Sequence, residues 1–179
     1  MKKTITLFLI ALAMWLSPTA WAQDTIYECN FDRQGDTSGW RFARENQSHF
    51  WVIGMDPSMS SRMLYVTYNG VDNAYYWESP TSVSYAYRRI VLPRGAYRFS
   101  YDWRCNGRRD GDTAYDYMRV LLVPGTMTPR GGDVPNGMGT MSDAVLPAGY
   151  IPLDGNEPKC ASPVWVSHSS DCCTEIIED

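Results

Sequence analysis

Three aspartates lie close together in the stretch CNGRRDGDTAYDYMRVLLV, which spans residues 105–123, and such a group could do chemistry. They are Asp110, Asp112 and Asp116. Carboxylate oxygens are ligands that Ca²⁺ prefers, and two carboxylates about 5–10 Å apart across a substrate can hydrolyse a glycoside. The same stretch contains the dipeptides Asn-Gly and Asp-Gly, which are typical of β-hairpin turns.

The residues favour the hairpin. An EF-hand loop needs acidic residues at alternate positions, a glycine at its sixth position and a glutamate at its twelfth. Here Gly111 directly follows Asp110, and the stretch 105–123 contains no glutamate. Proximity within one loop does not place two carboxylates on opposite sides of a substrate, so a catalytic pair is the weakest interpretation. A hairpin that also offers Asp112 and Asp116 as oxygen ligands to a hard cation stays open as the alternative.

A second acidic spot and a large set of aromatic residues are the other candidate sites. Asp32 and Asp36 lie in FDRQGDTSGW, which reads as a solvated loop with Gly35 as its hinge. The aromatic side chains include many tryptophans and tyrosines, more than a core of this size needs. Tyr and Trp rings stack on sugar faces and keep a polar tip, so those left exposed could bind a ligand. The candidates are Tyr75, Tyr85 and Tyr87.

Neither catalysis nor nucleic-acid binding finds support in the sequence. There is no Gly-x-Ser-x-Gly elbow, no His-Glu-x-x-His and no phosphate-binding loop. The net charge of −4 argues against binding to a phosphate backbone. The five cysteines have neither a zinc-site spacing nor an evident histidine partner, and the sequence does not give their pairing. We therefore expect a protein that is not an enzyme.

Residues 1–22 have the three parts of a cleaved signal peptide. Lys2 and Lys3 precede the apolar stretch 4–16, which is too short for a membrane span, and Ala20-Trp21-Ala22 fits the cleavage site. We expect a chain that is secreted or held at a bacterial cell surface, with no transmembrane segment after cleavage. The remainder has single-domain length.

The mature chain has a β pattern throughout. Short runs rich in Tyr, Trp, Val, Phe and Ile are separated by Gly, Pro, Asn and Asp, and no stretch has a good helical period. In 95–104 the aromatic residues alternate with polar ones, as in a strand with one covered face. These features predict a jelly-roll β-sandwich of two antiparallel sheets over 23–155, with a long Gly-, Pro- and Met-rich loop at 124–149. The other expected strands are 26–32, 38–44, 49–54, 62–68, 74–78, 84–92 and 115–123, with weaker ones near 150–153 and 163–167.

Six short motifs carry a resemblance to a known family. They are YECNFD, SGW, HFWVIG, YYWESP, YRFSYDWRCNG and YDYMRVLLVP, in this order over residues 27–124. The series resembles the MAM-like jelly-roll modules, whose bacterial versions include the cleaved-adhesin and choice-of-anchor domains of surface proteins in the Bacteroides group (Bacteroidota). The resemblance implies a non-catalytic extracellular module for adhesion or for binding carbohydrate or protein. It also implies a structural calcium ion to which Asp32 contributes.

The sequence departs from this family at two places. Ser38 stands where the eukaryotic pattern has a cysteine, so Cys29 lacks its implied partner. The family closes with an apolar strand, whereas this chain ends in SHSSDCCTEIIED. We therefore expect residues 156–179 to form an irregular or disordered tail after a truncation or frame shift. The sandwich would then lack its closing strand, and the exposed sheet edge would invite self-association.

Two further functions remain open beside the binding module. The chain could be the N-terminal accessory domain of a longer secreted peptidase or glycosidase. It could also be a structural surface or fibre subunit, which would self-associate through the exposed sheet edge.

Overall fold

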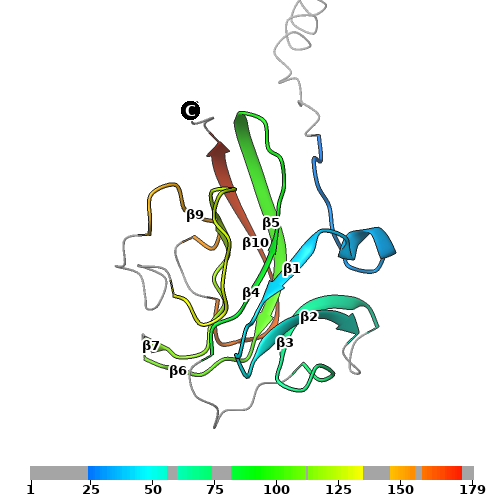
Figure 1. Ribbon diagram of the computed structural model, residues 1–179, viewed down its shortest axis with the longest axis vertical. Coiled ribbons are helices and arrows are strands. Elements are labelled where there is room, and N and C mark those ends of the chain that lie inside the picture. Colours follow the sequence, from blue (N-terminus) through cyan, green and yellow to red (C-terminus); the bar gives the residue numbers. More distant parts are fainter. Residues whose placement is uncertain are drawn as a thin grey trace, which may run out of the picture.

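The computed structural model describes residues 24–55, 60–73, 82–111, 113–134, 146–155 and 159–174 (Figure 1). In this part the chain consists of strands, turns and loops, with one single-turn 3-10 helix, η1 (Gln34–Thr37). The prediction of an all-β chain is therefore confirmed. Among the described residues, no helix has the length and apolar character needed to cross a lipid bilayer. The predicted signal peptide (1–22) and the predicted strand 74–78 lie outside the described residues.

The strands pair two by two, always antiparallel. β1 (Trp40–Ala43) pairs with β4 (Tyr85–Arg88), β2 (Phe50–Met55) with β3 (Arg62–Thr67), and β5 (Gly95–Cys105) with β10 (Ser162–Thr174). Four two-residue strands complete the pattern, with β6 (Arg109–Asp110) paired to β7 (Thr113–Ala114) and β8 (Leu121–Leu122) paired to β9 (Ile151–Pro152).

β5 is the longest strand that the sequence predicted. Its side chains alternate as expected, because Tyr97, Phe99, Tyr101 and Trp103 are half-buried while Ala96, Arg98, Ser100 and Asp102 between them are exposed. In Figure 1 it runs along the length of the molecule, with β10 beside it. The inner face continues on β10, where buried Cys172 lies opposite Tyr97.

The expectation of an irregular tail over 156–179 is wrong for Ser162–Thr174, which form β10, while 156–158 and 175–179 lie outside the described residues. The weak strand expected near 163–167 extends to Thr174 and pairs with β5 along most of its length. The reason is a ladder of side chains on the exposed face. Arg98 binds Asp171 at 2.7 Å, the hydroxyls of Ser100 and Ser169 lie 3.1 Å apart, and the Ser167 hydroxyl donates to Asp102 at 2.5 Å. Cross-strand polar pairs of this kind stabilise a register without any apolar contrast in the sequence.

Two other predicted strands differ from the structure. Residues 26–32 form no strand and lead through bends into η1. The predicted strand 115–123 is reduced to β8 and an isolated bridge between Met118 and Lys159. The described parts of the long loop, 124–134 and 146–149, contain no strand, in agreement with the prediction.

A buried ion pair holds β8 and β9 together. The Arg119 guanidinium lies 2.5 Å from the Asp154 carboxylate, and the two side chains are 6% and 0% exposed. Asp154 also accepts the Val120 N–H at 3.1 Å, and the Leu153 N–H donates to the Val120 carbonyl. The carboxylate and the guanidinium thus neutralise each other's charge at a site that is buried from solvent.

The half-buried aromatic face of β5 contains polar atoms that find no hydrogen bond among the described residues. They are the Tyr101 hydroxyl, Trp103 Nε1 and, on β10, His168 Nε2. The Tyr101 and His168 rings contact each other at a centroid distance of 5.3 Å. Burial, followed by the nearby Asp154 charge, raises the pKa of Tyr101. Tyr65 on β3 differs, because its hydroxyl donates to the Val71 carbonyl at 2.9 Å.

Breaking the buried pair should be costly. Asp154→Ala would leave the Arg119 charge buried and unbalanced, so we expect a loss of about 3–5 kcal/mol in the free energy of unfolding, measured by urea denaturation. Asp171→Ala is the matched control, because it removes the same group from the exposed Arg98 pair and should change the urea midpoint little. Equal losses of unfolding free energy in Asp154→Ala and Asp171→Ala would contradict the conclusion that the buried pair holds β8 and β9 together.

Removing the Tyr101 hydroxyl should not lower the free energy of unfolding, whereas removing the Tyr65 hydroxyl should lower it. Tyr101→Phe deletes a buried group with no observed partner and should leave the stability unchanged or raised by up to about 1 kcal/mol. Tyr65→Phe deletes a hydrogen bond and should lower it by about 1 kcal/mol. Urea denaturation of both variants measures the difference, and a larger loss for Tyr101→Phe would mean that its hydroxyl has a partner.

Candidate functional site

Asp110 and Asp116 lie at a hairpin, as the sequence favoured. β6 and β7 pair across Gly111, whose φ of 55° is in the left-handed region that glycine adopts without strain. The Asp116 carboxylate accepts the Arg108 N–H at 3.2 Å and so closes the base of this hairpin. A side chain at Gly107 would come within 2.0 Å of the Asp116 carbonyl oxygen, so the turn requires glycine there. Asp112 lies outside the described residues.

Asp32 has a structural contact of its own. Its carboxylate oxygen accepts the N–H of Arg62, the first residue of β3, at 2.8 Å, and its N–H donates to Asn30 Oδ1. The side chain is exposed and retains acceptor capacity, because a carboxylate has about four lone-pair sites. Among the described residues, no three His, Cys, Asp or Glu side chains come together as a metal site. The predicted set of Asp32, Asp112 and Asp116 stays a prediction.

The predicted tyrosine platform lies on β4. Tyr85 and Tyr87 are two residues apart and share one side of the strand, where both are half-buried, while Tyr75 lies outside the described residues. The Tyr85 hydroxyl donates to the Asp133 carbonyl, and burial, followed by the charge of Asp133, raises the pKa of Tyr85 to about 12. Tyr85 therefore holds the long loop against β4 through its hydroxyl. Of the two tyrosines, Tyr87 is the better candidate for contact with a ligand.

An exposed apolar segment at the beginning of β10 was missed by sequence reasoning. Val164, Trp165 and Val166 are 65%, 45% and 37% exposed. In a regular strand one of three consecutive side chains would face the other way from its neighbours and be covered, but the register with β5 shifts between Ser162 and Val166. The Arg104 guanidinium lies over the Trp165 ring at 5.4 Å. We call these four residues the Trp165 surface. The Val-Trp-Val run is visible in the sequence, but nothing in it indicates that all three side chains are exposed.

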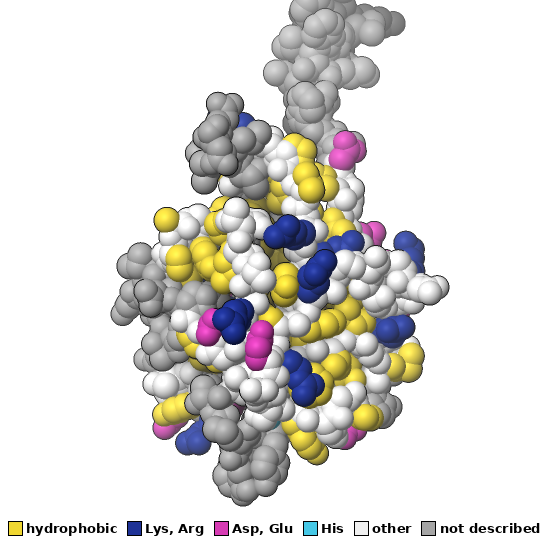
Figure 2. All heavy atoms as spheres, viewed as in Figure 1, with side chains coloured by type: hydrophobic (Ala, Val, Ile, Leu, Met, Phe, Trp, Pro, Cys, Tyr) yellow, Lys and Arg dark blue, Asp and Glu magenta, His cyan; other side chains and the backbone are white. Residues whose placement is uncertain are grey.

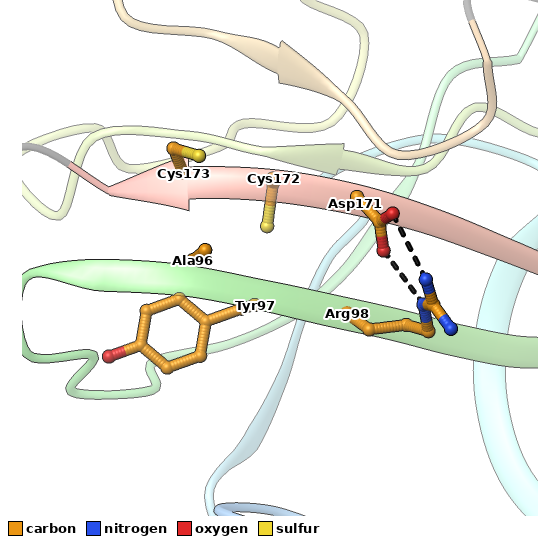
Figure 3. A pocket seen from close by; sticks show the side chains of 6 residues that line it. All are labelled: Ala96, Tyr97, Arg98, Asp171, Cys172 and Cys173. Carbon is orange, nitrogen blue, oxygen red and sulfur yellow. Dashed lines mark hydrogen bonds and ion pairs between the residues drawn. The ribbon is translucent and has the colours of Figure 1, made fainter. Parts of the chain in front are cut away.

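An open hollow of about 320 Å³ lies at the opposite end of the same strand pair. Its lining residues are Ala96, Tyr97, Arg98, Asp171, Cys172 and Cys173. Figure 3 shows Arg98 and Asp171 joined across β5 and β10, with the side chains of Cys172 and Cys173 on different sides of β10. The hydrogen bond from Arg98 lowers the pKa of Asp171, so this carboxylate stays ionised at neutral pH and is a poor proton donor.

The face of the molecule in Figure 2 mixes basic and hydrophobic side chains. Several Lys and Arg side chains stand among hydrophobic patches near the middle of this face, with Asp and Glu more thinly spread. Arginine beside aromatic side chains recurs elsewhere in the chain, because the guanidinium of Arg44 lies over Phe50 and that of Arg88 over Tyr27. Such contacts place the cation over the ring face, and Arg88 also donates to the carbonyls of Asp36 and Ser38.

No protein-family model matches the chain, and the comparisons with curated proteins and with solved structures also returned no match. The resemblance to the MAM-like modules stays a prediction from the six motifs.

The calcium prediction can be tested by thermal melts with Ca²⁺ and with EDTA. We expect Ca²⁺ to raise the melting temperature and Asp32→Asn to abolish the rise, because asparagine keeps the acceptor for the Arg62 N–H and removes the charge. Asp72→Asn, on the turn after β3, serves as the control and should keep the rise. A rise of equal size in Asp32→Asn would remove Asp32 from the ligand set.

Proposed function

We propose that the chain is a non-catalytic binding module that acts outside the cytoplasm, secreted or at the cell surface, and recognises carbohydrate or protein. The observation that carries the proposal is the Trp165 surface. A half-exposed tryptophan between two exposed valines costs solvation free energy in a monomer, and exposed apolar patches of this kind are typical of interaction sites.

The chemistry of this surface suits a sugar. An indole face stacks on the C–H groups of a pyranose ring, and an arginine beside it donates hydrogen bonds to hydroxyl or carboxylate oxygens. Arg104 and Trp165 already contact each other across the strand pair, so neither side chain has to be ordered fully on binding. Because the segment lies at a bulge, its side chains project from the end of the sheet.

The proposed architecture is the jelly-roll sandwich of MAM-like modules, with calcium as a structural ion. Antiparallel pairing and the half-buried aromatic face of β5 support it, because a strand with one covered face requires a second layer over that face. The signal-peptide pattern of residues 1–22 supports the extracellular location.

Self-association is the second candidate function, as a structural surface or fibre subunit. Among the described residues β5 pairs only with β10, so each of these two long strands has an unpaired edge. Open edges accept a strand from another molecule. Analytical ultracentrifugation of the mature chain separates the two functions, because a subunit associates without any added ligand.

Substitutions on the Trp165 surface test the binding proposal. We expect the mature chain to bind members of a glycan array or a panel of immobilised extracellular matrix proteins. Trp165→Ala should reduce this binding about 5- to 150-fold, since a stacked tryptophan contributes about 1–3 kcal/mol. Arg104→Lys should give a smaller loss, because lysine keeps the charge and loses the planar donor.

Tyr87→Ala is the matched control on the predicted tyrosine platform. It should leave binding unchanged, and the melting temperature of Trp165→Ala should stay within a few degrees of that of the unmodified chain. Loss of binding in Tyr87→Ala alone would move the site to β4. No binding to any member of either panel would reject the proposed function.

A further inference from the structure

Two cysteines meet where β10 begins. Cys105 ends β5 and is the register partner of Ser162, the first residue of β10. Cys160 lies two residues before Ser162. Directly opposite residues of an antiparallel pair lie side by side, so the end of β5 and the segment that leads into β10 meet at this point. Cys160 belongs to that segment and therefore lies near Cys105.

The contacts of the two thiols place them around the same peptide group. Cys160 Sγ donates to the Arg108 carbonyl at 3.6 Å, three residues beyond Cys105. The Ala161 N–H faces both sulfur atoms. Ala161 has a φ of 54°, so the chain turns sharply between Cys160 and the strand. Cys160 is only 8% exposed, and Cys105 is half-buried.

We propose that Cys105 and Cys160 form an intramolecular disulfide in the oxidised chain, which ties the end of β5 to the segment that leads into β10. This inference does not depend on the proposed ligand. The cross-link would fix the position from which the register shift of β10 starts.

The other cysteines do not compete for either partner. Cys172 and Cys173 are adjacent in a strand and point to opposite sides, with one buried and the other exposed. They pair with Tyr97 and Ala96, at the far end of β5 from Cys105. Cys29 Sγ donates to the Asp36 carbonyl, beside η1. Of the five cysteines, only Cys105 and Cys160 are brought together by the fold.

The oxidant is a small-molecule disulfide, such as oxidised glutathione. The thiolate of one cysteine attacks the S–S bond, forms a mixed disulfide and releases one glutathione thiolate. The second cysteine then attacks the mixed disulfide and releases the other, so two protein thiols are oxidised and one glutathione disulfide is reduced to two thiols. Burial raises the pKa of both cysteines, and the neighbouring Cys105 raises the pKa of Cys160 further. Since the thiolate is the nucleophile, the cross-link should form faster as the pH rises from 7 to 9.

Peptide mapping of the unmodified chain is the decisive experiment. The purified chain is equilibrated in excess oxidised glutathione, blocked with iodoacetamide, and digested without reduction by trypsin and chymotrypsin. These proteases release residues 105–108 and 160–165 as separate peptides, each with a single cysteine. We expect these two peptides joined, with Cys29, Cys172 and Cys173 outside this link. Recovery of both peptides unlinked, or of either joined to another cysteine, would overturn the proposal.

A melting experiment adds a readout on the fold. Reduction should lower the melting temperature of the unmodified chain by about 5–15 °C, because the cross-link closes a long loop in the unfolded chain. In Cys105→Ser the reductant should have no such effect, whereas Cys29→Ser, the control, should respond like the unmodified chain. A reductant effect that persists in Cys105→Ser would contradict the assignment. The mapping result stands without any variant.

Discussion

The pairing of β5 with β10 is the constraint on which most of the molecule depends. It brings together residues that are 57 to 79 positions apart, and it does so through a ladder of polar pairs on one side and half-buried side chains on the other. The hollow beside Arg98, the Trp165 surface and the neighbouring thiols of Cys105 and Cys160 all lie along this one pair of strands. Without β10, none of these arrangements would exist, because each takes residues from β5 and from β10 or the segment that leads into it.

A second anchor acts where the strands are short. β8 and β9 have two residues each, too few for backbone hydrogen bonds alone to hold them. The Arg119–Asp154 pair supplies the remaining constraint, because separating the two charges would leave one of them desolvated without compensation. The long loop between these strands is fastened separately, through the Tyr85 hydroxyl and the Asp133 carbonyl.

Features with a local cause were predictable from the sequence. The alternation in 95–104 correctly indicated a strand with one covered face, and Asp110-Gly111 correctly indicated a hairpin turn. Features whose cause lies far along the chain were not. Ser167, Ser169 and Asp171 form a strand face because their partners on β5 are polar, so the segment shows no apolar alternation. Asp154 follows an Ile-Pro-Leu run and reads as a surface turn, since nothing nearby reveals that Arg119 will neutralise it.

The same holds for the candidate site. The sequence pointed to an excess of aromatic side chains, and the structure distinguishes among them by burial and by hydrogen bonding. Tyr85 is engaged in holding a loop, and Trp165 is exposed because a register shift interrupts the strand. A shift of this kind depends on which residues of β5 lie opposite, so no pattern within 162–166 could have predicted it.

The long separation between β5 and β10 also sets the order in which the chain can mature. During synthesis, β5 emerges tens of residues before the strand that covers its edge. Until then its backbone groups and its aromatic side chains face solvent, where they can pair with other chains. Pairing at such separation is slow because a long loop must close first. β10 therefore completes the fold late. The yield of native chain would depend on how well the emerging chains are kept apart from one another until β10 has paired with β5.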